Sequence, residues 1–501
     1  MIARALTVAS VALFIAGCDV RAIIGETPDA GLNGETWAEL RLGTKTDKVD
    51  ILFMIDNSPS MAPKQSELRA RFPELIQVLD AFGAQGQPGH YHIGVVTSDL
   101  GAGAFTLGGG QCHPGGDGGK LQALGRAAPT GCLSPTGGLS FIDLDQASGV
   151  SNLPAGQDLA TTFGCMASVG DTGCGFEMQL ESVYQALHAP PPENAGFLRD
   201  DAILAVVFLT DEDDCSADPA TDLFDPSKTA VYGALLSYRC TQWGIQCGNP
   251  PQRPPYGSSA GPLDGCAAAP NPDGMGPGKL YDVNRYIDFF RQPAAAGGVK
   301  ANPSDVLLFA IDGPSEPFSV LLANPNPNPP GPYQSCVGPI DGSTCAAVLD
   351  HSCAAVDNPG FSGDPAVRIN AVVDNGTPNL GRSICDSSYL NTMQSLATSI
   401  VSYRSGNGCL PGPLRDPNDP SCDVEDEVPQ DDGTISVQRI ASCVKTDGAL
   451  PCWRVDSLPT CATVVDPLTQ KEQHLQLSVQ RGTALPPPNA TTRARCVIET
   501  P

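Results

Sequence analysis

Charged residues are scarce in this 501-residue chain, and positive ones are the scarcest. Asp, Glu, Lys and Arg make up 17% of it, with 29 Lys and Arg against 55 Asp and Glu, for a formal net charge of −26. Lys and Arg form no cluster along the chain. Because contacts to phosphates need a basic surface, this composition argues against nucleic-acid binding. The acidity favours solubility outside the cytoplasm over a specific cationic partner.

Several motifs of catalytic and metal-binding proteins are also missing. The cysteines are not arranged in paired C-x-x-C knuckles, which argues against zinc sites of that kind. The sequence contains no G-x-S-x-G, no P-loop and no H-E-x-x-H. Gly and Pro are abundant instead, at 54 and 47 residues, or about one residue in five. That share is below the level of a wholly disordered chain and predicts long irregular loops.

The N-terminus predicts export from the cytoplasm. A short positive region, 1–4, precedes a mostly apolar segment, 5–16, that is too short to span a bilayer, as in a signal peptide. The segment ends in Ile-Ala-Gly-Cys at 15–18, which resembles a bacterial lipobox. The resemblance implies a signal peptide over 1–17, lipid on Cys18 and a tether over 18–45 that anchors the protein to a membrane of the cell envelope. An ordinary signal peptide, with Cys18 incidental, is the alternative.

The number of cysteines agrees with an oxidising compartment. There are 19, so lipid on Cys18 would leave 18, enough for nine disulfides. One sequence cannot fix the connectivity. Neighbouring cysteines give four candidate pairs, namely Cys165 with Cys174, Cys240 with Cys247, Cys112 with Cys132, and Cys336 with Cys345.

Hydrophobic periodicity predicts an α/β fold with a mostly parallel sheet. Apolar runs predict strands at 48–56, 90–97, 202–210 and 305–311, with a short one at 139–142. Apolar residues spaced three and four apart predict helices at 65–79, 176–187, 281–291 and 387–403. Alternating strands and helices indicate right-handed βαβ units, here interrupted by insertions near 99–160, 213–278 and 314–363. Residues 406–501 predict a small disulfide-rich β module of unknown role.

One polar motif directly follows the first of these strands. In Asp56-Asn57-Ser58-Pro59-Ser60, a carboxylate and two hydroxyls alternate, so an extended loop turns all three toward one side. Ligands of open α/β sheets bind beyond the carboxyl ends of the strands, and hard oxygen donors suit Mg²⁺. The pattern resembles the D-x-S-x-S metal-ion-dependent adhesion site of von Willebrand factor A (vWA) domains.

The resemblance covers residues 46–405 and implies a doubly wound, Rossmann-like sheet that holds Mg²⁺, or else Mn²⁺ or Ca²⁺. The ligands would be Asp56, Ser58 and Ser60, a Thr from a second loop and an Asp from a third. Asp211, in the run Phe-Leu-Thr-Asp, resembles the third-loop residue, although Glu212 stands where the family has Gly. Thr172 is the second-loop candidate, with Asp171 and Thr97 as alternatives. Such an ion keeps one coordination position open for an Asp or Glu of a protein ligand, so the sequence predicts an adhesion or interaction protein and not an enzyme.

Other interpretations stay open. Asp56 and the serines could simply cap the following helix. A metal-assisted hydrolase could use the same acidic cluster, but it needs a general base, and no His lies close in sequence to Asp56 or Asp211. The chain could also be a structural surface protein with a vestigial site. His90 and His92 share a strand face without an evident Cys or carboxylate partner, so we interpret them as a surface pair and not as metal ligands.

Overall fold

We analysed a computed structural model of the whole chain. It describes residues 36–42, 46–84, 88–255, 261–269, 278–324, 334–336, 345–355, 358, 361–374, 383–386, 388–405, 408–410, 412–416, 419–430, 434–457, 464–465, 472–481 and 490–498. The predicted signal peptide and the predicted lipid site at Cys18 lie outside these residues. Within them, no helix has both the length and the apolar character needed to cross a membrane.

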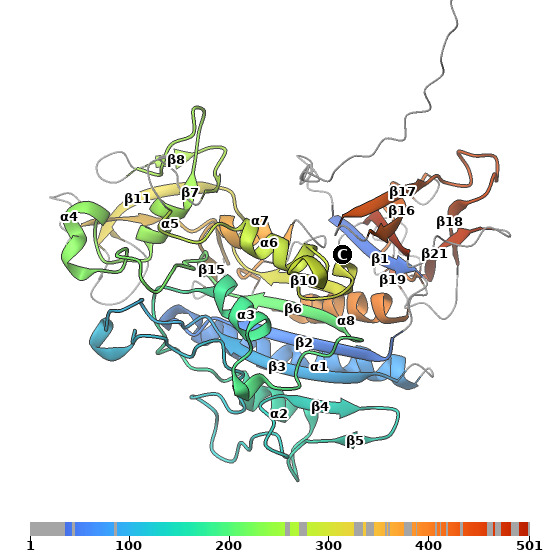
Figure 1. Cartoon of the computed structure of the whole chain (residues 1–501), viewed down its shortest axis with the longest axis horizontal. Helices are drawn as coiled ribbons and strands as arrows, with labels where there is room; N and C mark the ends of the chain where they lie inside the picture. Colours follow the sequence, from blue (N-terminus) through green and yellow to red (C-terminus); the bar gives the residue numbers. More distant parts are fainter. Residues whose placement is uncertain are drawn as a thin grey trace, which may run out of the picture.

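A six-stranded sheet forms the centre of the molecule, with the strand order β10-β6-β2-β3-β4-β5 (Figure 1). The first four strands are parallel, and β4 and β5 add to the β3 edge in antiparallel pairing. β6 and β10 are buried along their whole length, as expected of apolar strands covered on both faces. The bounds are β2 Lys48–Ile55, β3 His90–Thr97, β4 Ile142–Asp145, β5 Val150–Ser151, β6 Ile203–Leu209 and β10 Val306–Ile311.

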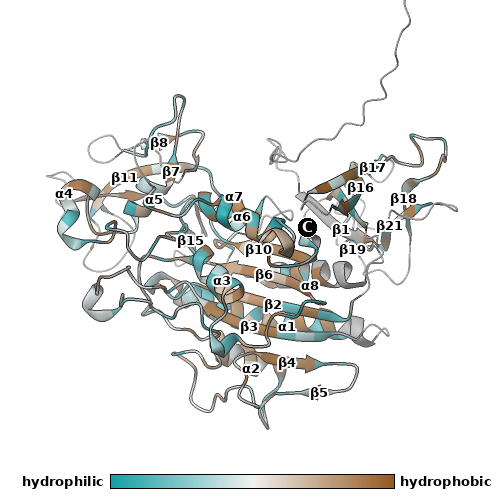
Figure 2. Ribbon diagram, in the orientation of Figure 1, coloured by the Kyte–Doolittle hydropathy of each residue, from teal (hydrophilic) through white to brown (hydrophobic). Residues whose placement is uncertain are grey.

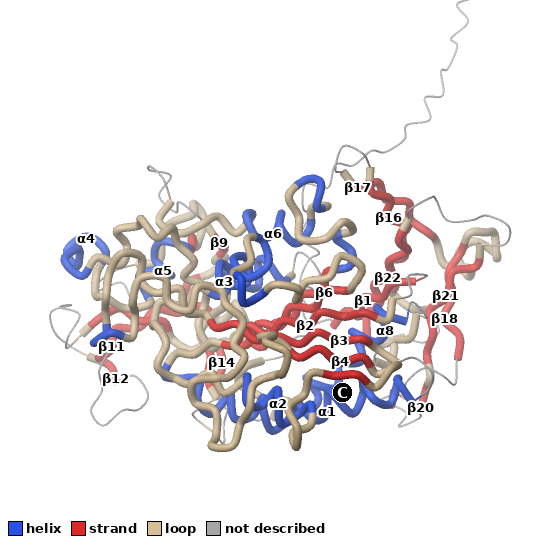
Figure 3. The backbone as a smooth tube through the Cα atoms, turned by 60° about the horizontal axis from the view of Figure 1, so that its bottom comes forward, coloured by secondary structure: helices blue, strands red, loops and turns tan. Residues whose placement is uncertain are grey.

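Helices cover both faces of this sheet (Figure 3). Alternate residues of β2 point to opposite faces: Phe53 packs in one hydrophobic cluster and Leu52 in the other. The Phe53 cluster includes side chains of α1 Ala62–Ala84, α2 Leu159–Met166 and α8 Leu390–Ser405. The Leu52 cluster includes side chains of α3 Gln179–His188, α6 Asn284–Arg291 and α7 Val367–Val373. Figure 2 shows the corresponding hydrophobic colouring of the central strands.

The prediction of a mixed α/β fold with a mostly parallel sheet is therefore confirmed. Each long apolar run forms a strand, and each of the four predicted helices is present with its ends shifted by a few residues. The short strand predicted at 139–142 begins instead at Ile142. Sequence reasoning missed α2 and α7, since both are short and stand next to insertions.

The insertions carry their own small elements. A second sheet joins β8 Gly261–Leu263, β11 Phe318–Asn324, β12 Gln334–Ser335 and β13 Ala346–Leu349. Two-stranded pairs join β7 Ile245–Gln246 with β9 Ala267–Ala268, and β14 Cys353–Ala354 with β15 Ser362–Gly363. Two short helices, α4 Thr229–Tyr232 and α5 Tyr238–Gly244, precede β7. Single 3-10 turns are η1 Pro59–Met61, η2 Gly108–Gly110, η3 Pro192–Asn194, η4 Pro226–Lys228, η5 Ala294–Ala296 and η6 Pro303–Asp305.

Disulfides link these loops, but mostly not between sequence neighbours. Of the four candidate pairs, Cys336–Cys345 forms, and the other three are wrong. Cys112 and Cys132 were predicted to pair with each other. Instead, Cys112 bonds to Cys174 and Cys132 bonds to Cys165, both in the segment around α2. Such pairing depends on how the chain folds back, which spacing alone does not show. The described residues also form the disulfides Cys215–Cys240, Cys247–Cys266, Cys353–Cys385, Cys422–Cys496 and Cys443–Cys452.

The C-terminal segment forms β structure beside the central sheet (Figure 1). Its main sheet has the order β1-β22-β16-β17, and β18 pairs with β21 and β19 with β20. The bounds are β1 Thr36–Leu42, β16 Cys422–Pro429, β17 Ile435–Ile440, β18 Cys452–Ser457, β19 Val464–Val465, β20 Glu472–Gln473, β21 Leu475–Gln480 and β22 Thr491–Ile498.

β1 corrects the predicted tether over 18–45. Residues 36–42 pair antiparallel with β22 along their whole length, from Thr36 opposite Ile498 to Leu42 opposite Thr492. The buried Leu40 packs with Trp453 and Leu477 in the core of this module. A strand with a buried partner is no free linker, and the partner lies about 450 residues away in sequence, where no local pattern could reveal it. The module therefore includes both ends of the described chain.

We expect Leu40→Ala to destabilise the C-terminal module by about 2–4 kcal/mol, because it removes a fully buried side chain from a small core. Hydrogen exchange should show faster exchange of the β16 and β22 amides and unchanged exchange in β2 and β6. Val437→Ala on β17, where the side chain is 41% exposed, is the matched control and should leave the module unchanged. Equal exchange in both variants would show that β1 contributes nothing to the module.

Candidate metal centre

Three neighbouring parallel strands end side by side and bring the predicted motif to one edge of the sheet. Ile55, the last residue of β2, pairs with Thr97 of β3 on one side and with Leu209 of β6 on the other. The residues that follow are therefore adjacent, and the backbone N–H of Asp56 donates to the carbonyl of Leu209 at 2.9 Å. This carboxyl edge of the sheet is where open α/β folds bind their ligands.

Asp56 is completely buried and is surrounded by hydroxyl and amide donors. Its Oδ1 accepts from the backbone N–H of Ser58 at 2.8 Å and from Ser98 Oγ at 3.3 Å. Its Oδ2 accepts from Thr210 Oγ1 at 2.7 Å. Even so, burial and the nearby charge of Asp211 raise the pKa of Asp56 to about 6. Its negative charge is therefore not fully compensated by the groups around it.

The two serines connect the first loop to the third. Ser58 Oγ lies 3.2 Å from Ser60 Oγ, and Ser60 Oγ donates to Asp211 Oδ1 at 3.0 Å. Lys64 Nζ, on the buried face of α1, donates to the other Asp211 oxygen at 2.5 Å. The Ser58 side chain makes no capping hydrogen bond to the turn that follows it. This observation argues against helix capping as the reason for the serines.

The structure brings Asp56, Ser58, Ser60 and Asp211 together but leaves Thr172 outside their hydrogen-bond network. The Thr172 side chain is exposed, and among the described residues no hydrogen bond joins it to the motif. The backbone of its loop does reach the motif, since the Gly173 N–H donates to the Asn57 carbonyl at 2.8 Å. A Cβ at Gly173 would lie 2.2 Å from Asn57 Oδ1, so this approach requires glycine. The second-loop ligand predicted from the resemblance therefore stays a prediction, and its geometry is unfavourable here.

Glu177, which sequence reasoning did not single out, comes from the same second loop. Its side chain is 1% exposed, and neither carboxyl oxygen makes a hydrogen bond of ordinary geometry to a described residue, although its side-chain interaction with Glu212 contributes to the pKa shifts of both acids. Burial, then the neighbouring charges of Glu212 and Asp56, raise its pKa well above the usual range. A buried carboxyl group without a donor is costly, so its presence beside Asp56 calls for an explanation. The sequence signal was weak, because Glu177 looks like an ordinary residue at the start of the predicted helix.

The departure from the family at Glu212 adds another acid to this edge. Burial, followed by the charges of Asp364, Asp211 and Asp56, raises the pKa of Glu212 to about 8. Asp364 is held nearby, because its backbone N–H donates to the carbonyl of Asp211 at 2.8 Å. Its Oδ1 lies 2.7 Å from His351 Nδ1. Glu212 and Asp364 also line a small pocket at this edge, together with Asp213 and Leu349.

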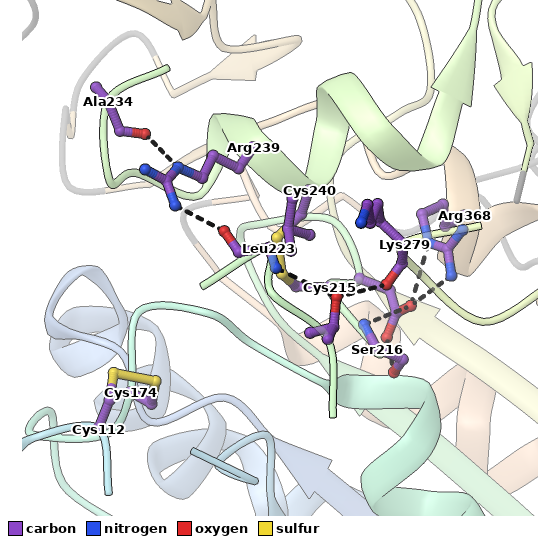
Figure 4. The surroundings of a disulfide bond; sticks show 12 residues. Cys112, Cys174, Cys215, Ser216, Leu223, Ala234, Arg239, Cys240, Lys279 and Arg368 are labelled. Carbon is purple, nitrogen blue, oxygen red and sulfur yellow. Dashed lines mark hydrogen bonds and ion pairs between the residues drawn. A yellow bond between two sulfur atoms is a disulfide. The ribbon is translucent and has the colours of Figure 1, made fainter. Parts of the chain in front are cut away.

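Two disulfides hold the loops that carry these acids (Figure 4). Cys174, bonded to Cys112, lies three residues before Glu177, and Cys215, bonded to Cys240, follows the acidic run that begins at Asp211. The Cys215 N–H donates to the Glu177 carbonyl at 2.7 Å, which joins the two loops directly. Further along the chain, Asp214 pairs with the buried Arg368 of α7 at 3.1 Å. Covalent and ionic links therefore fix both loops.

These residues provide the donor set of a hard divalent cation. Serine hydroxyls and carboxylates are the ligands that Mg²⁺ and Ca²⁺ prefer, and the buried Glu177 could supply a further oxygen. Lys64 already provides one positive charge, but it contacts Asp211 and leaves Asp56 and Glu177 without a cation in contact. The donor chemistry therefore suits a hard cation, but in the described part of the chain no three of these carboxylates bring ligand atoms within 4.8 Å of one another. Which of them would bind it directly, and which through water, is not fixed by these contacts.

Without metal, we expect the stability of the protein to fall as the pH rises from about 5 to about 8. The pKa values of Asp56 and Glu212 are raised to about 6 and about 8 in the folded state, so the folded protein holds protons that the unfolded chain has already released. Urea midpoints measured in EDTA with intact disulfides test this expectation. Glu212→Gln should flatten the profile, whereas Asp145→Asn, which changes an exposed group of lowered pKa, should leave it unchanged.

If stability falls with pH as steeply in Glu212→Gln as in the parent, Glu212 does not hold the extra proton of the folded state.

Comparisons with known proteins give no family for the chain. No protein-family model matches it, and no curated protein matches it. Three solved structures are weakly similar: the pilus adhesin SpaC from Lactobacillus rhamnosus GG in its open conformation (10% identity, TM-score 0.30), the pilus adhesin RrgA from Streptococcus pneumoniae (9%, 0.25) and an adhesive tip pilin from Group B Streptococcus agalactiae (8%, 0.25). Each match covers 94% of this chain, but 44%, 60% and 85% of the respective adhesin. The chain thus spans less than two thirds of the first two, and similarity at this level carries no argument about function.

Proposed function

We propose that this chain is an envelope-anchored lipoprotein of the vWA type that binds a protein ligand through a divalent cation. The observation that carries the proposal is the buried Glu177 carboxyl group, whose interacting side chain among the described residues is another acid, Glu212, and which lies in the electrostatic range of Asp56. A cation between the second loop and the D-x-S-x-S motif would satisfy both groups. Mg²⁺ is the first choice, with Mn²⁺ and Ca²⁺ as alternatives.

The balance of charge at the carboxyl edge supports a cation. Asp56, Glu177, Asp211, Glu212 and Asp364 all lie here. The charge of another of these acids helps to raise the pKa values of Asp56, Glu177, Glu212 and Asp364. The contacting basic groups are Lys64, on Asp211, and His351, on Asp364. Buried charges persist when they are paired or when they coordinate a metal. A divalent ion would therefore stabilise the ionised form of this edge.

The vWA resemblance supplies the link from metal to partner. In that family the ion keeps one position open, and a carboxylate of the bound protein fills it. At such a partly dry site one metal–carboxylate bond can anchor an interface as a hot spot does. The predicted lipid on Cys18 would hold the domain at a membrane surface, where a binding protein meets its partners. The C-terminal module leaves the carboxyl edge free, because β1 leads into the opposite, amino end of β2.

A metal-assisted hydrolase is the second candidate, and His351 is the observation that favours it. The structure brings this histidine, 140 residues beyond Asp211 in sequence, close enough for the Asp211 charge to act on it. Its hydrogen bond to Asp364 raises its pKa, however. A histidine held in its protonated form is a poor general base near neutral pH, so we rank binding first. The third interpretation, a structural protein with a vestigial site, is favoured by the two departures from the family pattern, Glu212 in place of Gly and an exposed Thr172 that does not join the motif.

We expect Mg²⁺ to stabilise the parent protein and not the Glu177→Gln variant. At ten times its dissociation constant, an ion that binds only the folded state adds about 1.4 kcal/mol. In EDTA at about pH 8 the order should reverse: the variant should be the more stable, because it no longer has to hold a proton on a buried acid whose pKa is raised. Thermal melts of oxidised protein over a Mg²⁺ and Mn²⁺ series measure both effects.

Glu181→Gln on α3 is the matched control for this experiment. Glu181 is also buried, but it is paired with Arg285 and Tyr286. Its loss should lower stability with and without Mg²⁺ and should leave the metal response intact. If Mg²⁺ stabilises neither the parent nor Glu181→Gln, the metal site is rejected.

Partner binding should depend on the same ion. We expect proteins captured from a surface extract on immobilised parent protein in Mg²⁺ to be released by EDTA and to be absent with Asp56→Ala. The far-ultraviolet circular dichroism of the variant, compared with that of the parent, controls for misfolding. Partners that remain bound in EDTA would contradict the metal-dependent mechanism. Hydrolysis of a peptide or phosphate ester that is lost in His351→Asn would favour the second candidate instead.

A further inference from the structure

A second group of metal-binding side chains lies at the opposite, amino end of the sheet. In the described part of the chain, His90, His92 and Asp143 are the one group of three or more His, Cys, Asp or Glu side chains whose ligand atoms all lie within 4.8 Å of one another. His90 begins β3, whereas the Asp56 motif follows the carboxyl end of β2. We propose that His90, His92 and Asp143 bind Zn²⁺ and thereby cross-link β3 to β4.

The β3–β4 register supplies the carboxylate partner that the sequence did not reveal. β4 pairs antiparallel with β3, and Asp143 lies directly opposite His92. His90 and His92 share one face of their strand, and so does the residue opposite His92. The interpretation of the two histidines as a surface pair is wrong for His92, which is buried, and it had not taken the carboxylate partner Asp143 into account. Asp143 is 51 residues away in sequence, inside the first insertion.

The three ligand atoms are spaced for one small ion. Asp143 Oδ1 lies 2.7 Å from His90 Nε2 and 3.6 Å from His92 Nε2. Two ligands of a tetrahedral zinc, each about 2.1 Å from the metal, lie about 3.4 Å apart. The observed separations lie on both sides of that value, so small side-chain rotations would place all three around one ion.

The tautomer of His92 is set by its other nitrogen. His92 Nδ1 lies 2.8 Å from the backbone carbonyl of Phe197, a group that can only accept, so Nδ1 carries the proton. The lone pair is then on Nε2, which lies 3.6 Å from Asp143 Oδ1. A second-shell hydrogen bond from one ring nitrogen to a carbonyl is the usual arrangement for a histidine that binds metal. Burial also lowers the pKa of His92 to about 4, which keeps the imidazole neutral and available as a ligand.

Neighbouring charged groups are already engaged and do not compete for the ion. Asp50 lies 3.7 Å from His92 Nδ1, but it is fully buried and accepts from the Arg199 side chain at 2.7 Å. Lys300 Nζ lies 4.0 Å from the other Asp50 oxygen, Oδ2. Asp145, opposite His90, accepts from Ser148 at 2.7 Å. The ion would therefore have two imidazoles and one carboxylate as protein ligands.

This donor set distinguishes the ion from the one proposed at the carboxyl edge. Imidazole suits borderline metals such as Zn²⁺, whereas Mg²⁺ and Ca²⁺ prefer oxygen alone. The His90 and Asp143 side chains are 27% and 38% exposed, so water can reach the fourth coordination position. The site stands on β3 and β4 alone and does not depend on the proposed function.

The proposal is tested by zinc titration of the full-length oxidised protein in detergent. Cys18 is alkylated if it is not lipidated. We expect the parent to take up one equivalent of Zn²⁺ in competition with a chromophoric chelator. His90→Asn and Asp143→Asn should each weaken binding about 100-fold. Co²⁺ in place of Zn²⁺ should give the visible bands of a four-coordinate site, and a large excess of Mg²⁺ should not displace it.

Three further variants make the result decisive. Asp145→Asn changes the neighbouring carboxylate of β4, and His113→Asn removes an exposed histidine elsewhere; both should bind Zn²⁺ as the parent does. Asp56→Ala should also retain the zinc, which separates this site from the one at the carboxyl edge. The proposal is overturned if the parent takes up no zinc, or if Asp143→Asn, folded by circular dichroism, binds it as tightly as the parent. Loss of zinc in Asp56→Ala but not in Asp143→Asn would assign the ion to the other edge and equally overturn it.

Discussion

The parallel register of β2, β3 and β6 is the constraint on which the rest of the structure depends. Because of this register the three buried strands end side by side, so the residues that follow each strand lie close to one another. In this chain Asp56, Ser98 and Thr210 follow, and the hydroxyls of Ser98 and Thr210 both donate to the buried Asp56 carboxylate. Water cannot solvate charge there, so each further acid raises the pKa of its neighbours. The chemistry of this edge is thus a consequence of strand alignment, and the burial that stabilises the sheet is also what makes a cation favourable.

Covalent links explain how loops of this length can hold a fixed arrangement. The second loop and the segment after β6 bring Glu177 and Glu212 to the edge, and both are fastened by disulfides a few residues from the acids. A loop that presents an unpaired buried carboxyl group would otherwise rearrange to expose it, because exposure removes the desolvation cost. The Cys215 N–H that donates to Glu177 closes the remaining gap between the two loops. The oxidising compartment that the cysteine count predicts is therefore a condition for the site and not only for the fold.

The sequence predicted what depends on local pattern and missed what depends on long-range pairing. The central strands were evident because runs such as 203–209 are apolar on both faces, and α8 was evident from its helical spacing. Asp56, Ser58, Ser60 and Asp211 followed from a motif at the end of such strands. Thr172 was chosen by its position before a helix, but the structure buries a different residue of that loop, Glu177, within electrostatic range of Asp56. Likewise, β1 is a strand because it pairs with β22, and Asp143 lies beside His92 because β4 pairs with β3. No spacing rule connects residues that far apart in sequence.

The two ends of the sheet differ in a way that bears on metal selection. The carboxyl end offers hydroxyls and carboxylates that are buried close together, which favours a hard ion. Without an ion, the ionised carboxylates there destabilise the folded state. The amino end offers two imidazoles and one carboxylate near the surface, where the ligands can form ordinary hydrogen bonds when no metal is bound. The first site would therefore affect stability at every pH at which its acids ionise, whereas the second would add a cross-link without a large cost when empty. Because nitrogen donors discriminate against Mg²⁺ and the oxygen cluster has none, ions at the two ends would not compete for the same ligands.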